Sequence, residues 1–199
     1  MDILLVLGLL AGVLSVISYI PYVLDTLKGS TKPERATWFI WSVLTTILLF
    51  AQLAKGATHS IWLTAVQTFG PILIFLLSIR YGEGGFNKRD IAALLAAGAG
   101  IIAWYFTQEA AFALWITIAI DFSGALLTII KAYEKPETET QATWLISAIA
   151  GGLAALAVGA WSPSLLAFPV YVLIVNSMVL IAIKLGIMEK VKARHSSHA

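Results

Sequence analysis

Of the 199 residues in this chain, 59% are hydrophobic and only 12% are charged, and the mean hydropathy is +0.88. Soluble domains carry about a quarter of charged residues, so this composition excludes an ordinary soluble domain and predicts an all-α integral membrane protein. The net charge of +2 decides little as a total, and the absence of cysteine excludes disulfides, thiolate chemistry and cysteine-based metal sites.

Seven apolar stretches reach or approach the roughly 17–25 residues that a helix needs to cross a bilayer. The first is interpreted as a span and not as a cleavable signal peptide, because no basic segment precedes it. The polar segments between the stretches are too short to hold a soluble domain. In chain order, we expect transmembrane helices near residues 3–26, 37–54, 59–80, 91–107, 110–131, 143–160 and 164–186.

The basic residues predict how these seven spans are oriented. With the N-terminus outside, only Lys55 falls on the outer side. Lysine and arginine concentrate on the inner side of membrane proteins, so the N-terminus is expected outside and the C-terminus inside. The other twelve basic residues then lie on the inner side: Lys28, Lys32, Arg35, Arg80, Lys88, Arg89, Lys131, Lys135, Lys184, Lys190, Lys192 and Arg194.

An internal repeat organises the spans. Residues 28–38 read KGSTKPERATW and residues 131–144 read KAYEKPETETQATW, and both lie on an inner loop after the first helix of a three-helix unit. Two units in the same orientation need one extra crossing between them, so the plan is a 3+1+3 parallel repeat. Chance reuse of loop residues is the alternative. The predicted organisation is residues 1–82 for the first unit, 83–108 for linker helix 4, 109–187 for the second unit and 188–199 for a polar, basic tail at the inner surface.

Three segments resemble the PQ-loop and SWEET families. SYIPYVLDTLKGSTKPERATWFIW, residues 18–41, is similar to the PQ-loop signature, with Pro21 in the proline place and Tyr22 where glutamine is usual. In the second unit, DFSGALLTIIKAYEKPE, residues 121–137, has Gly124 in the proline place. QTFGPIL, residues 67–73, resembles the Asn-Thr/Ser-x-Gly pattern of sugar-transporting SWEETs, with Gln67 at the sugar-contacting asparagine.

This resemblance implies a transporter of the SWEET, SemiSWEET and PQ-loop type that moves a small polar solute, sugar-like or another small metabolite, by alternating access. PnuC-type vitamin transporters and the KDEL receptor use the same fold, so a vitamin carrier and a receptor or binding protein are the alternatives. The departures at Tyr22, Gly124 and Gln67 separate the chain from each subfamily pattern.

Asp121 lies about 11 residues from either end of its predicted span, close to the bilayer midplane. A carboxylate there costs roughly 2.5 kcal/mol or more and normally faces a bundle interior or water. Two interpretations stay open: Asp121 contacts substrate and couples transport to protons, or it is a structural carboxylate. The repeat aligns Asp121 with Ser18, which is also polar.

Other polar and aromatic residues lie at similar depth. Trp41 and Thr45 are one helical turn apart and share a face, whereas Asn176 and Tyr171 are rival counterparts of Gln67. Such groups can also simply hold helices together by hydrogen bonds. The predicted substrate pocket comprises Trp41, Thr45, Gln67, Asp121, Ser147, Tyr171 and Asn176. Tryptophans nearer the span ends are expected to be interface anchors: Trp38, Trp62, Trp144 and Trp161, with Trp104 and Trp115 beside an outer turn.

Prolines predict where the helices bend. Each proline inside a span frees a backbone carbonyl, so these residues are hinge candidates or static kinks. Tyr22 and Asp25 are inner gate candidates, with Lys28 or Arg35 as partner. The hinge candidates are Pro21, Pro71 and Pro169.

The sequence carries no signature of an enzyme, and no cofactor or metal is expected, because the three histidines lack metal-ligand spacing. The expected partners are a small-molecule substrate and the lipid bilayer, without nucleic acid, and a homo-oligomer stays open. The expected location is multi-pass in the inner or plasma membrane of a bacterium or archaeon.

Overall fold

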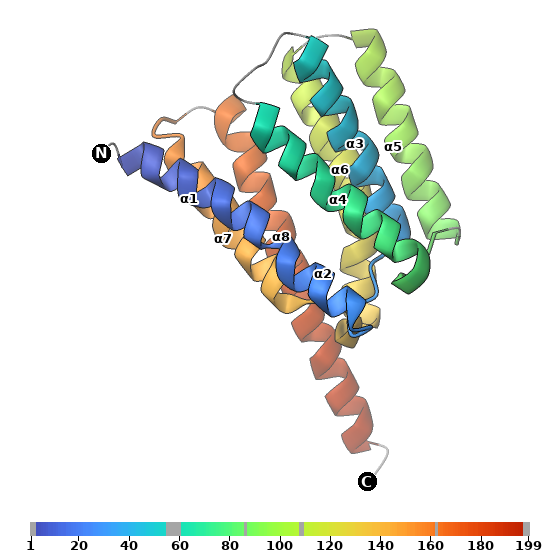
Figure 1. Cartoon of the computed structure of the whole chain (residues 1–199). Helices are drawn as coiled ribbons and strands as arrows, with labels where there is room; N and C mark the ends of the chain where they lie inside the picture. Colours follow the sequence, from blue (N-terminus) through green and yellow to red (C-terminus); the bar gives the residue numbers. More distant parts are fainter. Residues whose placement is uncertain (1–2, 55–60, 86, 108–109, 162, 197–199) are drawn as a thin grey trace.

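The chain is all-helical over the residues described by the computed structural model, which are 3–54, 61–85, 87–107, 110–161 and 163–196 (Figure 1). This confirms the predicted all-α class. The elements are α1 (Ile3–Ile17), α2 (Tyr19–Leu27), α3 (Arg35–Ala54), α4 (Ile61–Tyr81), α5 (Lys88–Thr107), α6 (Ala110–Glu134), a short 3-10 helix η1 (Pro136–Thr138), α7 (Gln141–Ala157) and α8 (Pro163–Ser196).

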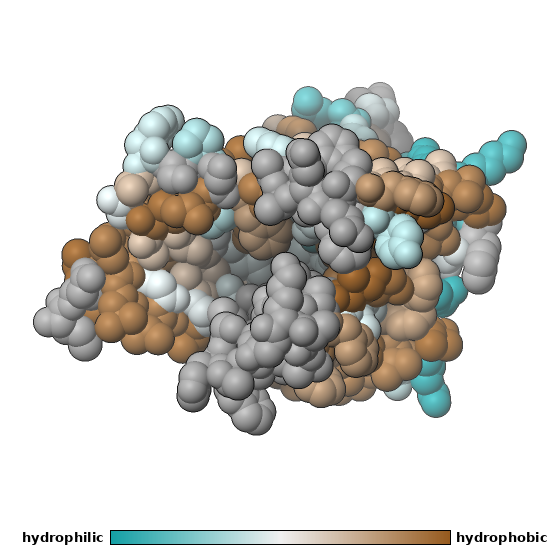
Figure 2. Space-filling model, turned by 90° about the horizontal axis from the view of Figure 1, so that it is seen from above, coloured by the Kyte–Doolittle hydropathy of each residue, from teal (hydrophilic) through white to brown (hydrophobic). Residues whose placement is uncertain are grey.

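Among the described residues, three helical stretches are long and apolar enough to cross a membrane: Ile3–Leu27, Leu114–Glu134 and Leu165–Ser196. Large apolar side chains also cover the outside of the bundle, where Phe106 is 77% and Leu95 is 69% exposed. Figure 2 shows such residues over much of one end and its flanks. Soluble proteins rarely expose apolar surface on this scale, and the surface is compatible with burial in lipid.

The helices occupy the predicted apolar stretches, with two differences. The first stretch divides at Ser18 into α1 and α2, because Pro21 has no N–H to donate to the carbonyl of Ile17. The last stretch continues to Ser196 instead of ending at 186, since residues 187–196 contain no glycine or proline to stop a helix. The segment expected to be a polar tail is therefore largely helical.

Two helix pairs join the first half of the chain to the second. Helix α1 packs along α7, and α3 packs along α6. Within the halves, α3 packs on α4, whereas α8 packs on both α6 and α7, and α5 lies against α6 (Figure 1). The bundle therefore has an interior bounded by helices of both halves.

Hydrogen bonds between connecting segments close one end of the bundle. We call this the loop end and define it by residues 28–34, 82–85 and 135–140. The Lys32 amide donates to the Thr138 carbonyl at 3.1 Å, and the Glu83 amide donates to the Pro33 carbonyl at 2.9 Å. The first KPE segment, residues 32–34, therefore contacts the chain directly after the second KPE segment, residues 135–137.

Glycine permits the closest helix contacts. At Gly124, a Cβ atom would lie 3.4 Å from the Trp41 indole nitrogen, so α3 and α6 approach closely where the first unit has Pro21. At Gly186, a Cβ atom would collide with the backbone carbonyl of Tyr133, near the end of α6. Small residues at such places let helix backbones pack in contact.

Replacing Gly186 by alanine is therefore expected to destabilise the fold. The new methyl group meets backbone, which cannot rotate away, and overpacking of this kind costs about 1–3 kcal/mol. Gly98→Ala on α5 is the matched control, because its Cβ would have no atom within 4 Å and Gly→Ala within a helix stabilises by about 0.5–1 kcal/mol. Thermal unfolding in detergent should show a lower Tm for Gly186→Ala alone; equal Tm values for the two variants would contradict the packing.

Candidate functional site

A cavity of about 280 Å³ lies between the two halves of the bundle. Its described lining residues come from α1, α2, α3, α4, α6, α7 and α8. Figure 2, which views the end opposite the loop end, shows a recess in that end of the molecule. A concave site with a few converging polar groups is the usual form of a small-molecule site.

The cavity brings together most of the predicted pocket residues. Gln67 lies on α4, but its side chain falls outside the described side chains. Ser18, the repeat counterpart of Asp121, also lines the cavity, as do Pro71 and Pro169. The remaining six predicted residues all line it: Trp41, Thr45, Asp121, Ser147, Tyr171 and Asn176.

Asp121 is the meeting point of three helices. From α8, the Tyr171 hydroxyl donates a hydrogen bond to its Oδ2 atom at 2.5 Å. From α3, the Trp41 indole N–H donates to its backbone carbonyl at 3.2 Å. The carboxylate is thus held beside an indole ring and a phenol, at the boundary between the two halves.

Four polar side chains of the lining donate to a backbone carbonyl three or four residues earlier in the chain. Donation to the carbonyl three or four residues earlier is the common habit of serine and threonine in helices. Thr143 differs, because its hydroxyl is buried and has no hydrogen-bond partner among the described residues. The internal bonds are Ser15 to Ala11 at 2.8 Å, Ser18 to Ser15 at 2.7 Å, Thr45 to Trp41 at 2.8 Å and Asn176 Nδ2 to Val172 at 2.8 Å.

The prediction that Trp38 and Trp144 are interface anchors is wrong. They are only 2% and 3% exposed, and both line the cavity. Helices α3 and α7 begin two residues before the predicted starts of their spans, so each tryptophan already lies a turn inside a helix that faces the interior. The spacing of Trp38 from Trp41 and its repeat match to Trp144 were the signals in the sequence that pointed to this arrangement.

The other predicted anchors either lie away from the cavity or have side chains that the structure does not describe. Trp161 is 92% exposed and Trp115 is 59% exposed, and neither lines the cavity. The side chains of Trp62 and Trp104 are outside the described side chains. Their anchoring role stays a prediction.

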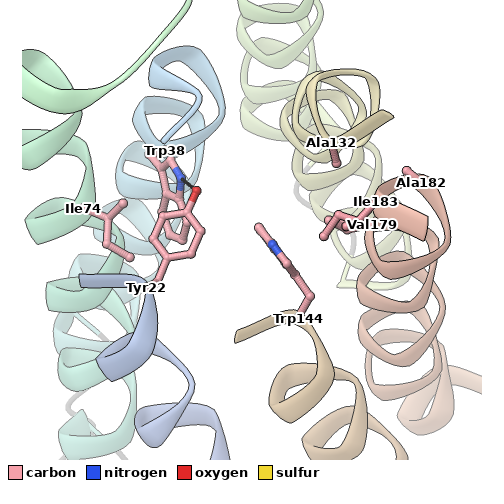
Figure 3. Close-up of a cluster of buried hydrophobic side chains, with 8 residues drawn as sticks. All are labelled: Tyr22, Trp38, Ile74, Ala132, Trp144, Val179, Ala182 and Ile183. Carbon is pink, nitrogen blue, oxygen red and sulfur yellow. Dashed lines mark hydrogen bonds between the residues drawn. The ribbon is translucent and has the colours of Figure 1, made fainter. Parts of the chain in front are cut away.

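Two tryptophans of the cavity lining, Trp38 and Trp144, belong to a buried cluster that also contains Tyr22 (Figure 3). Tyr22 is fully buried, with its ring centroid 5.0 Å from that of Trp38 and 5.8 Å from that of Trp144. The Trp38 indole N–H donates to the Tyr22 hydroxyl at 3.3 Å. The gate candidate Tyr22 therefore sits in a closed apolar layer with aromatic residues of both halves.

The second gate candidate, Asp25, lies beyond this layer. Its Oδ2 atom accepts a hydrogen bond from the Thr140 hydroxyl at 3.1 Å, and its Oδ1 atom lies 3.9 Å from Lys28 Nζ. Of its two expected partners, Arg35 instead donates to the carbonyls of Ser78 and Gly84. Asp25 thus links α2 to the segment before α7.

A buried ion pair fastens the loop end. Lys131 Nζ lies 2.6 Å from Glu139 Oε1, and the two side chains are 8% and 0% exposed. Lys131 Nζ also donates to the backbone carbonyl of Lys32, in the first KPE segment. The Trp144 indole N–H donates to Glu139 Oε2 at 2.9 Å, so the pair is coupled to the aromatic cluster.

Lys131→Met is expected to destabilise the fold by about 3–5 kcal/mol, because it leaves Glu139 charged and buried without its partner. Lys190→Met is the matched control, since Lys190 pairs with Glu137 at 2.6 Å on the surface. Such exposed pairs contribute about 0–1 kcal/mol. Thermal unfolding of both variants in detergent measures the difference, and a small Tm change in Lys131→Met would show that the buried pair is not a main support.

Glu34 is a second buried carboxylate at the loop end. Its Oε2 atom accepts hydrogen bonds from the Thr37 amide at 2.7 Å and the Thr37 hydroxyl at 3.0 Å. Its Oε1 atom is buried without a hydrogen-bond partner among the described residues. Burial raises the pKa of Glu34, and the nearby charge of Asp90 adds to the increase, against the two bonds from Thr37.

This raised pKa predicts a pH dependence of stability. The folded state holds the Glu34 proton more tightly than the unfolded state, so this stabilisation is complete below the ordinary pKa of 4.5 and is lost as the pH rises through the raised value. The Tm advantage of wild type over Glu34→Gln should therefore shrink from pH 4 to pH 8. For Glu137→Gln the trend should reverse, because Lys190 lowers the pKa of Glu137; parallel trends would contradict both assignments.

Compared with protein families, curated proteins and solved structures, this chain matches none of them. The described residues also contain no group of three or more histidine, aspartate or glutamate side chains that could hold a metal ion. The interpretation of the site therefore depends on its own geometry.

Proposed function

We propose that this chain is a membrane transporter of a small polar solute. The observation that carries the proposal is the cavity between the two halves, where a carboxylate, two phenols and three indoles converge inside a largely apolar helix bundle. Polar groups at such depth are expensive in lipid, so they mark a substrate or ion pathway by default. The scaffold is a seven-span protein with its N-terminus outside and its C-terminus inside.

The distribution of charge supports this orientation. Lys28, Lys131 and Lys135 lie at or beside the loop end, and the basic C-terminal part of α8 projects from the same end of the bundle (Figure 1). The basic side of a membrane protein faces the cytoplasm. The loop end is therefore the inner end, and the recess in Figure 2 faces outward.

The helix contacts support a parallel repeat with α5 as the linker. The sequence alignment relates α1 and α2 to α6, α3 to α7, and α4 to α8. Under this relation the contact of α1 with α7 becomes the contact of α6 with α3, and both contacts are present. Two equivalent interfaces of this kind surround one central site, as an axis along the membrane normal requires.

The proposed mechanism is alternating access, and closure of the cavity toward the loop end supports it. The aromatic cluster and the hydrogen bonds of the loop end lie on the side that we propose to be inner, so they support an outward-facing assignment for this conformation. Transport needs the two units to separate at Tyr22 and Asp25 while they close above Asp121. The junction between α1 and α2 at Ser18 is the most direct place for such bending, because Pro21 has no N–H to donate to the carbonyl of Ile17.

The lining also bears on the alternatives. A receptor for a peptide carboxylate needs a cationic pocket, and the described lining contains no lysine, arginine or histidine. A PnuC-type vitamin carrier needs aromatic residues on both halves, and Trp38 and Trp144 supply them. The vitamin carrier is therefore the second candidate function, and like the first it is a transporter without enzymatic activity.

Uptake into proteoliposomes tests the proposal. The solutes are mono- and disaccharides, neutral amino acids and organic cations, each with and without an inward proton gradient. We expect saturable uptake of one class, reduced about tenfold or more by Asp121→Asn, because a charged hydrogen-bonding group at the site is removed.

Glu134→Gln is the matched control, since Glu134 lies on the same helix but outside the cavity, paired with Arg89 at 2.6 Å. Loss of uptake in both variants would assign the effect to folding. Gradient-dependent uptake that fails in Asp121→Asn alone would make Asp121 the proton-coupling residue. Absence of uptake for every solute by folded wild-type protein would overturn the transporter proposal.

A further inference from the structure

The central cavity has a definite electrostatic sign. Among its described lining residues, Asp121 is the one carboxylate, and no lysine, arginine or histidine balances it. The phenol of Tyr171 donates to Asp121 but brings no positive charge. A negative charge inside an apolar helix bundle is unfavourable unless a cation or a proton accompanies it. The cavity beside Asp121 is therefore suited to a positive group.

The hydrogen-bonding pattern of the lining points the same way. Ser15, Ser18, Thr45 and the Asn176 amide donate to backbone carbonyls three or four residues earlier in the chain. What these side chains still offer to a solute is mainly oxygen acceptors. Tyr19 and Ser147 also line the cavity, and their hydroxyls can donate or accept. Acceptors therefore outnumber the donors left for an anion or a sugar. A solute that carries positive charge matches an acceptor-rich lining best.

The aromatic residues supply a third independent feature. The ring centroid of Trp41 lies 4.9 Å from that of Trp38 and 6.4 Å from that of Trp144, and all three rings line the inner end of the cavity. The Trp41 N–H bond to Asp121 fixes this ring beside the residue that bears the carboxylate. Indole faces attract cations more strongly than other rings do, especially where water is excluded.

We propose that the solute is a small organic cation of the alkylammonium or quaternary ammonium class, with its charged group between Asp121 and the indole of Trp41. The inference deepens the transporter proposal, on whose central site it rests. The volume of about 280 Å³ limits the solute to a small molecule.

A metal cation fits this site poorly. Hard divalent cations take six or more oxygen ligands, several of them carboxylates, or keep several waters, whereas the described lining offers one carboxylate and its other side-chain oxygens are neutral. Aromatic rings attract a weakly hydrated organic cation more effectively, because its methyl or methylene groups can contact the rings directly. The carboxylate of Asp121 then attracts the positive charge, and the indole rings contact the apolar groups around it.

Choline and 3,3-dimethylbutan-1-ol are a decisive pair of probes, because they differ in the replacement of the charged nitrogen by carbon. Isothermal titration calorimetry on the full chain in detergent compares their dissociation constants. We expect choline to bind about tenfold or more tightly than the neutral alcohol. Equal affinity, tighter binding of the alcohol or no binding of either probe would overturn the inference.

Variants then assign the preference to residues. Asp121→Asn keeps an acceptor for Tyr171 and should remove most of the preference for choline, whereas Glu134→Gln should retain it. Trp41→Leu should weaken choline about tenfold, with Trp161→Leu as the control because that ring is exposed and outside the cavity. Unchanged affinity in folded Asp121→Asn and Trp41→Leu would overturn the assignment; if either variant fails to fold, the probe pair on wild-type protein still decides the charge preference.

The binding and uptake experiments separate the two proposals. Uptake of a neutral solute by protein that does not bind choline overturns the cation assignment and leaves the transporter. Choline binding without uptake of any solute supports the cation site and overturns transport. Binding and saturable uptake of choline, with both lost in Asp121→Asn, support the two proposals together.

Discussion

The buried ion pair between Lys131 and Glu139 is the interaction on which the closed loop end depends. Charges removed from water are stable only when each has its partner and its hydrogen bonds. Here Lys131 also donates to Lys32 of the first KPE segment, and Glu139 accepts from Trp144. This ion pair therefore joins the two halves of the chain through Lys32, and it holds Trp144, which lines the cavity, in place.

The same side chains therefore line the cavity and close it toward the loop end. Trp38 and Trp144 line the cavity on one side and pack around Tyr22 on the other. A rearrangement that opens the inner side has to separate these rings, and that same movement reshapes the surface on which a solute lies. In the proposed transporter, occupancy of the site and closure of the inner side are linked through shared side chains, without a relay through the rest of the bundle.

The sequence predicted the helical class and six residues of the cavity, because long apolar runs form helices in lipid and polar side chains at depth turn toward the interior. Gln67 stays a prediction. The cavity roles of Trp38 and Trp144 were missed, since a tryptophan near the end of an apolar run more often lies at the membrane interface. Their direction depends on where α3 and α7 begin, and helix ends are the least reliable part of a sequence-based prediction. The burial of Lys131 depends on contacts between segments about a hundred residues apart, which no local pattern reports.

In the proposed repeat, the two halves differ in a way that divides their physical roles. The first unit carries Pro21 and a broken helix, whereas Gly124 at the related position leaves α6 continuous. The related lysines differ as well: the side chain of Lys28 is 70% exposed, and that of Lys131 is 8% exposed. With Asp121 in place of Ser18, the second unit holds both the deep carboxylate and the buried ion pair on one unbroken helix. In the proposed transporter, a bending element then lies opposite a rigid one, so movement concentrated near Ser18 opens the site without displacing the carboxylate of Asp121.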